Sequence, residues 1–77
     1  MNGLLLVYVK DNDNHMLDIV QTISMMNVNV DGIKLMNKSD NSLYEVNCYV
    51  TGIDQLNKLL VNLCKNSYIE KVERAYR

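Results

Sequence analysis

Residues able to do chemistry are few in this 77-residue sequence, and the best candidates lie close together near its start. His15 is the only histidine, and no cysteine or second histidine stands at metal-ligand spacing from it. We interpret His15 as a residue at a loop-to-helix junction rather than a ligand or general base. Asp11 and Asp13 could bind a cation only together with further ligands. We interpret them instead as turn-forming residues of a loop. The sequence therefore predicts no metal site and no cofactor.

Other catalytic signatures are also missing. Cys48 and Cys64 each sit inside an apolar pattern with no histidine nearby in sequence. We expect two buried free thiols, with a disulfide or metal pair as the alternative. No glycine-rich loop that could cradle a phosphate follows a predicted strand. We predict that the domain has no catalytic residues.

Charge and composition exclude further classes of protein. A net charge of −1 produces no strong electrostatic attraction to nucleic acid or to a membrane surface. The longest apolar run, Leu4 to Val9, is too short to span a bilayer and lacks the cationic flank of a signal peptide. We expect a cytoplasmic chain with one domain, residues 1–77. A chain of this size buries only about 60% of its unfolded surface, so a partner chain is the expected support.

Apolar periodicity predicts the elements that position these residues. Residues Gly3 to Lys10 are predicted to form a strand. Its odd-numbered and even-numbered positions are both apolar, which is typical of a central strand covered on two sides. A helix follows from about His15 to Met26, with Asn14 as its cap and Asn27 as a left-handed end. The next strand changes parity beside Gly32, which indicates a β-bulge there.

The second half of the chain repeats this order. After a loop from Asn37 to Asn41, a strand alternates Tyr44, Val46, Cys48 and Val50 with outward residues. A capping box of Thr51 and Asp54 is expected to open a second amphipathic helix. A last strand runs from Tyr68 to Arg77, with Val72 as its surest inward residue.

Two helices that cross between strands imply two β-α-β units. Right-handed crossovers place both helices on one face of a four-stranded antiparallel sheet, which gives an α+β, ferredoxin-like β-α-β-β-α-β sandwich. The other sheet face is then open, although Leu4 to Val9 is apolar on both sides and Leu43 and Tyr49 point away from the inward side. We predict that a second copy or a neighbouring domain covers this face; stray surface apolar groups are the ordinary alternative.

An RNA-binding sheet and a metal chaperone share this fold class. Neither is favoured, because Tyr44 and Tyr49 lie on opposite faces of their strand and the loop from Asp11 to His15 has no cysteine pair.

The order of elements, the loop from Asp11 to Met16, the bulged segment from Asn27 to Gly32 and the closing Ile69 to Arg74 resemble an ACT domain. More narrowly, they resemble the C-terminal ACT domain of RelA/SpoT-type GTP pyrophosphokinases, which make and degrade (p)ppGpp. The resemblance covers nearly the whole chain. It implies a regulatory or docking domain at the C-terminus of a larger protein whose synthetase and hydrolase domains lie upstream. Such a domain would relay amino-acid starvation signals from the ribosome and uncharged tRNA in the stringent response.

The resemblance also implies a ligand site. ACT domains of metabolic enzymes bind amino acids in paired domains through the loop after the first strand, and the corresponding candidates here are Asp11, Asn12, Asp13, Asn14, His15 and Met16, with Asp31 and Gly32 at the bulge. That loop usually reads aspartate, two variable residues, glycine and leucine, whereas these positions hold Asn12, His15 and Met16.

Histidine in place of glycine brings bulk to the mouth of the pocket, where glycine would let a ligand approach the backbone. A docking role is therefore favoured over amino-acid binding. The alternative is an amino-acid-binding ACT domain of a biosynthetic enzyme or a free-standing sensor.

Overall fold

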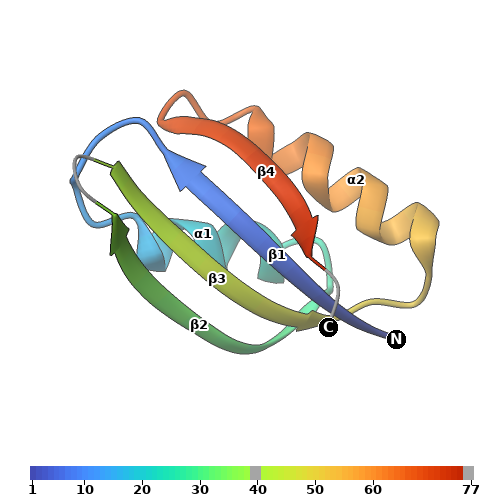
Figure 1. Cartoon of the computed structure of the whole chain (residues 1–77). Helices are drawn as coiled ribbons and strands as arrows, with labels where there is room; N and C mark the ends of the chain where they lie inside the picture. Colours follow the sequence, from blue (N-terminus) through green and yellow to red (C-terminus); the bar gives the residue numbers. More distant parts are fainter. Residues whose placement is uncertain (39–40, 76–77) are drawn as a thin grey trace.

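The strands form one antiparallel sheet with both helices packed behind it (Figure 1). The computed structural model describes residues 1–38 and 41–75, and the side chains of residues 1–36 and 42–75. The elements are β1 (Asn2–Val9), α1 (Met16–Ser24), β2 (Asn29–Lys38), β3 (Asn41–Tyr49), α2 (Ile53–Cys64) and β4 (Ile69–Ala75). The strand order is β2-β3-β1-β4. This confirms the predicted β-α-β-β-α-β sandwich.

The core lies between the helices and one face of the sheet. Alternate residues of β1 and β3 point inward, as their period of two predicts, and meet the apolar stripes of α1 and α2. The residues with no solvent exposure are Leu5, Val7, Val9, Ile19, Ile23, Tyr44, Val46, Val50, Leu59 and Leu63. Apolar burial of this kind is the main stabilising term in so small a domain.

The opposite sheet face, which carries Leu4, Leu6, Tyr8 and Leu43 on its two central strands, is called the uncovered face below. No helix packs on it (Figure 1). The three β1 side chains are half-buried, whereas Leu43 is buried among its neighbours at 5% exposure. Tyr49 is exposed, as predicted. Both faces of β1 are therefore apolar, but one lies in the core and the other lies on the uncovered face.

Two predictions about the backbone are confirmed: the left-handed conformation of Asn27 and the β-bulge beside Gly32. The glycine, however, is not what causes the bulge. Asn27 has a φ of 60° and ends the first helical region in the left-handed conformation. The β2–β3 register shifts between Val30 and Gly32, which leaves Asp31 as the extra residue of a bulge. Gly32 has no positive φ, and an added Cβ would meet no atom within 4 Å. The bulge therefore does not require glycine at this position.

The helix starts differ from their predictions. His15, not Asn14, is the N-cap of α1, although the Asn14 Oδ1 accepts the Met16 N–H at 3.0 Å. The capping box of Thr51 and Asp54 is wrong because Gly52 is the N-cap of α2 and makes no side-chain cap bond. The Gln55 Oε1 instead accepts the Thr51 N–H at 2.7 Å, one residue before the cap.

Several side-chain and boundary predictions are corrected. Cys48 is buried, but Cys64 is exposed at the end of α2. Ile69, at 4% exposure, is the buried residue of β4, whereas Val72 is half-buried. Of the expected loop from Asn37 to Asn41, Asn37 and Lys38 belong to β2 and Asn41 belongs to β3, and residues 39 and 40 lie outside the described part. The predicted last strand extends to Arg77, but residues 76 and 77 lie outside the described part.

Within the described residues, no helix has the length and apolar character needed to cross a membrane.

Leu59→Ala should lower the free energy of unfolding by about 2–5 kcal/mol, because it leaves a cavity where a fully buried side chain stood. Val61→Ala, on the outer side of α2 at 61% exposure, is the matched control and should change it by less than about 0.5 kcal/mol. Urea denaturation followed by circular dichroism measures both. Equal transition midpoints for the two variants would show that α2 is placed with the wrong face inward.

Candidate functional site

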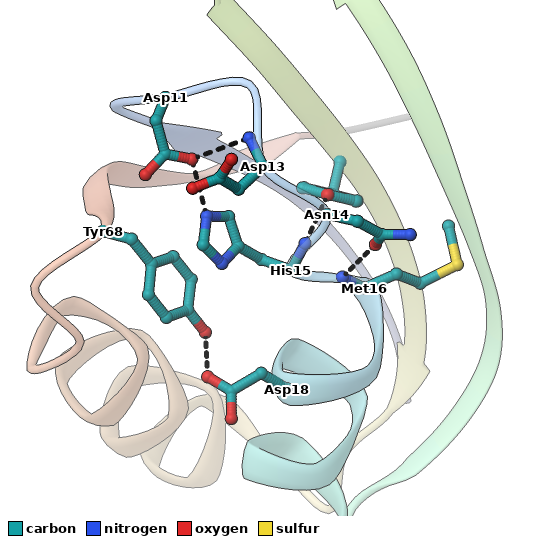
Figure 2. Close-up of polar contacts among 8 residues, drawn as sticks. Asp11, Asp13, Asn14, His15, Met16, Asp18 and Tyr68 are labelled. Atoms are coloured by element: carbon teal, nitrogen blue, oxygen red, sulfur yellow. Dashed lines mark hydrogen bonds and ion pairs between the residues drawn. The ribbon is translucent and has the colours of Figure 1, made fainter.

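Five of the eight candidate site residues lie in the loop between β1 and α1, and a sixth, Met16, is the first residue of α1. Figure 2 shows Asp11, Asp13, Asn14, His15 and Met16 of this group. The loop's own polar groups fix its shape: the Asp11 Oδ1 accepts the Asp13 N–H at 3.0 Å, and the Asn14 Oδ1 accepts the Met16 N–H. Side chains of aspartate and asparagine commonly form such turns two residues along the chain. The loop is therefore a set of local turns that lead into the first turn of α1.

His15 is held on two sides at the point where the loop becomes α1. Its Nε2 lies 2.7 Å from the Asp11 Oδ1, and its ring stacks on Tyr68 with centroids 3.8 Å apart and planes 3° from parallel (Figure 2). The His15 side chain is 15% exposed. Stacked aromatic rings and a hydrogen bond to a carboxylate each restrict its rotation. The loop-to-helix position predicted for His15 is thus correct.

A buried hydroxyl ties this loop to the core. The Tyr44 side chain has no solvent exposure, and its hydroxyl oxygen accepts the His15 N–H at 2.9 Å. A buried tyrosine hydroxyl needs such a partner, and the first N–H groups of a helix need acceptors. One hydrogen bond meets both requirements and places the start of α1 against β3.

Tyr68 completes the site from the far end of the chain. It lies just before β4, and its hydroxyl donates to the Asp18 carboxylate in the first turn of α1 (Figure 2). Burial and this hydrogen bond both raise the pKa of Tyr68, so the phenol stays protonated and keeps donating. Sequence reasoning missed Tyr68, because it took this residue only as the start of the last strand.

The carboxylate of Asp11 has a lowered pKa. The hydrogen bond with His15 lowers the pKa of Asp11 below its ordinary value of 3.8, and the Asp13 N–H adds to this effect. Asp11 therefore stays ionised to a lower pH than a free aspartate, and it can keep orienting the imidazole.

Asp11, Asp13 and His15 each offer a ligand atom, and these atoms lie within 4.8 Å of one another. In the described part of the chain this is the set that could approach a common cation. The structure thus places His15 beside the two aspartates, a grouping that sequence reasoning had not predicted. Two of the three ligand atoms, however, already bond each other across the Asp11–His15 contact.

The remaining candidates lie elsewhere. Gly32 pairs with Asn47, which also pairs with Leu4 near the start of β1, and the bulged Asp31 precedes Gly32, whereas the loop follows the end of β1. Asp31 lines a hollow of ≈ 520 Å³ at that end of the sheet. Of the loop residues, Asn14 and Met16 line a separate groove of ≈ 510 Å³ beside Ile33 of β2, and Asn12 is simply exposed. One chain therefore does not bring all eight candidates together.

Asp11 should titrate below 3.8 in the folded chain, and His15→Ala should move its pKa back toward that value by removing the main cause of the shift. Because the pKa is lowered only in the folded state, the contact stabilises the fold above about pH 4, and this contribution is lost as the pH falls through the lower folded value. The carboxyl carbon NMR shift of Asp11 across a pH series measures it.

Asp13→Asn is the matched control, since it keeps the backbone N–H that Asp11 accepts and should not raise the pKa of Asp11. An Asp11 that titrates at its ordinary value in the unmodified chain would contradict the hydrogen bond to His15.

Comparison with known proteins agrees with this fold. The family model of the ACT domain matches residues 3–74. A crystal structure of the ACT domain from GTP pyrophosphokinase of Chlorobium tepidum is 23% identical with a TM-score of 0.81, and covers 97% of this chain and 97% of that chain. A solution NMR structure of that domain is 22% identical with a TM-score of 0.83, covering 100% and 88%. The C-terminal domain of the MgtC protein from Mycobacterium tuberculosis is 18% identical with a TM-score of 0.74, covering 96% and 84%.

A search of curated proteins gives no match. At under 25% identity, the structural likenesses establish the fold, and the family model establishes more because it covers nearly all of the chain. The protein thus belongs to the ACT domain family, whose members are regulatory modules without catalytic activity of their own.

Proposed function

We propose that this chain is the regulatory and docking domain of a (p)ppGpp synthetase/hydrolase, where it relays amino-acid starvation signals in the stringent response. The likeness to the ACT domain of a GTP pyrophosphokinase, over 97% of both chains, supports the choice of parent enzyme. Neighbouring domains of the parent chain, the ribosome and tRNA are the partners that this role implies. The docking part of the proposal depends mainly on the position of His15.

The His15 ring occupies the place where a glycine would leave the backbone bare. It lies flat on Tyr68 and bonds to Asp11, so it cannot swing away without losing both contacts. A ligand that approached this junction would first have to displace a 15%-exposed ring. Releasing such a ring loses both a stacking contact and a hydrogen bond to a carboxylate.

Backbone donors of the loop are also already occupied. The N–H groups of Asp13, His15 and Met16 donate to Asp11, Tyr44 and Asn14, respectively. Free N–H groups at a helix start are the usual binding site for a carboxylate. With three of them satisfied internally, the junction offers little to the carboxylate of an amino acid, which favours docking.

The groove beside α1 favours the alternative, an amino-acid-binding ACT domain of a biosynthetic enzyme or a free-standing sensor. Its ≈ 510 Å³ lie within the size range of small-molecule sites, and Met16, Leu17, Val20 and Ile33 give it an apolar lining. An apolar side chain could enter it from outside without displacing His15.

Adding each amino acid to millimolar levels should leave the amide NMR spectrum of the labelled chain unchanged if the domain docks rather than senses. His15→Gly is the matched variant, since it removes the ring while the contact between Asn14 and Met16 remains. Binding by the variant alone would show that His15 closes the site. Saturable shifts at residues 11–16 or beside Ile33 in the unmodified chain would instead support the amino-acid sensor.

Removing residues 1–77 from the parent protein should leave basal (p)ppGpp synthesis in place but abolish its increase during amino-acid starvation. The physical reason is that a docking domain carries the signal and none of the catalytic groups. Nucleotide levels in starved and fed cells measure this. An unchanged starvation response, or a parent protein without synthetase and hydrolase domains, would contradict the proposed parent.

A further inference from the structure

A hollow of ≈ 430 Å³ lies on the outer surface of α2, beside the segment that follows α1. It is called the helix groove below, and its lining residues are Met26, Asn57, Lys58, Val61, Asn62 and Lys65. None of these residues belongs to the loop between β1 and α1 or to the bulge of β2. The helix groove is therefore a surface separate from the candidate site described above.

Apolar groups form the middle of the helix groove. Val61 is 61% exposed, although it lies on a helix whose opposite side is buried in the core. The Sδ of Met26 accepts a hydrogen bond from the Asn62 Nδ2 at 3.0 Å, so the segment after α1 is held against α2. A methionine side chain is flexible and polarisable, which suits contact with apolar groups of varied shape. The chain thus presents a preformed apolar surface at this place.

Both charged residues of the helix groove are lysines. Lys58 lies three residues before Val61 and Lys65 lies four residues after it, so the three side chains follow one stripe of the helix surface. The two lysines are about 10 Å apart along the helix axis. Within the described part of the chain neither lysine makes an ion pair. The position of Lys65 at the negative end of α2 explains that lysine, but it does not explain Lys58 or the exposed valine between them.

We propose that the helix groove docks an acidic amphipathic helix of a protein partner. An apolar side chain of the partner contacts Val61 and Met26, and one carboxylate lies at each lysine. A helix laid along α2 meets the two lysines with residues that are seven apart, and it places the residues midway between them over the apolar middle. Opposite charges at the two ends of the contact speed association and fix its register. The proposal does not depend on the parent enzyme.

The chemistry of the helix groove favours a protein helix over RNA, a membrane or an extended peptide. An apolar middle offers no donor to a phosphate backbone, and two lysines on a chain of net charge −1 are too few to hold nucleic acid or anionic lipid firmly. The lining consists of side chains from α2 and the end of the α1 region, so it presents no strand edge to which an extended peptide could add.

An alanine-based helical peptide that carries two glutamates seven residues apart, with leucines midway between them, is the probe. Its addition to the labelled chain should give saturable amide NMR shifts at Met26, Asn57 and Val61. Lys58→Glu and Lys65→Glu should each weaken binding about fivefold, because each replaces an attraction by a repulsion. The variant with both changes should instead prefer a second peptide in which lysines replace the two glutamates.

Lys34→Glu is the matched control, because it makes the same charge change on β2, away from the helix groove, and should leave binding unchanged. Val61→Ala should weaken binding by a few-fold, since it removes part of the apolar contact, whereas it hardly alters the stability of the fold. Circular dichroism confirms that each variant folds.

An absence of shifts with both peptides up to millimolar concentration would overturn the proposal. Equal affinity of the unmodified chain for the two peptides would also overturn it, because the lysines would then play no part in recognition. Vesicles of anionic phospholipid or single-stranded RNA that shift the amides of the helix groove, where the glutamate peptide does not, would overturn it in favour of that ligand.

Discussion

Both crossover connections of this chain bring their helices to the same side of the sheet, and the rest of the structure depends on that packing. One sheet face meets α1 and α2 and forms the only large apolar interior of the described residues, in which Leu59 and Val7 lose all solvent contact. The other face is left to solvent or to a partner. Because a domain of this size has little apolar area to spare, apolar groups such as Leu6 on the second face are the basis for the prediction of a partner there.

The loop after β1 depends on the same core. Tyr44 is an inward residue of β3, yet its hydroxyl reaches the rim of the core and accepts the His15 N–H. Tyr68, in the connection from α2 to β4, stacks on the His15 ring. The start of α1 is therefore held by groups from β3, from the approach to β4 and from the loop itself. A change that loosens the core would also loosen this junction.

A filled junction is consistent with a domain that transmits contacts instead of sensing a small molecule. In the ACT family pattern a glycine leaves this position open, whereas here an imidazole, a phenol and two carboxylates satisfy one another. The uncovered face lies on the opposite side of the sheet from the helices. A docking role would thus have two separate surfaces, the loop with its neighbouring helix ends and the uncovered face, joined through β1.

The sequence by itself determined the elements, their order and their inward faces, because periods of two and near four are local properties of strands and helices. It also determined the left-handed Asn27 and the bulge before Gly32, since parity and residue type signal both. Only the tertiary structure decided which distant side chains meet. The bond between Tyr68 and Asp18 joins residues 50 positions apart, and no local pattern encodes such a distance. Likewise the exposure of Cys64 and the gathering of Asp11, His15 and Tyr68 follow from how helices and strands pack, which depends on the whole core at once.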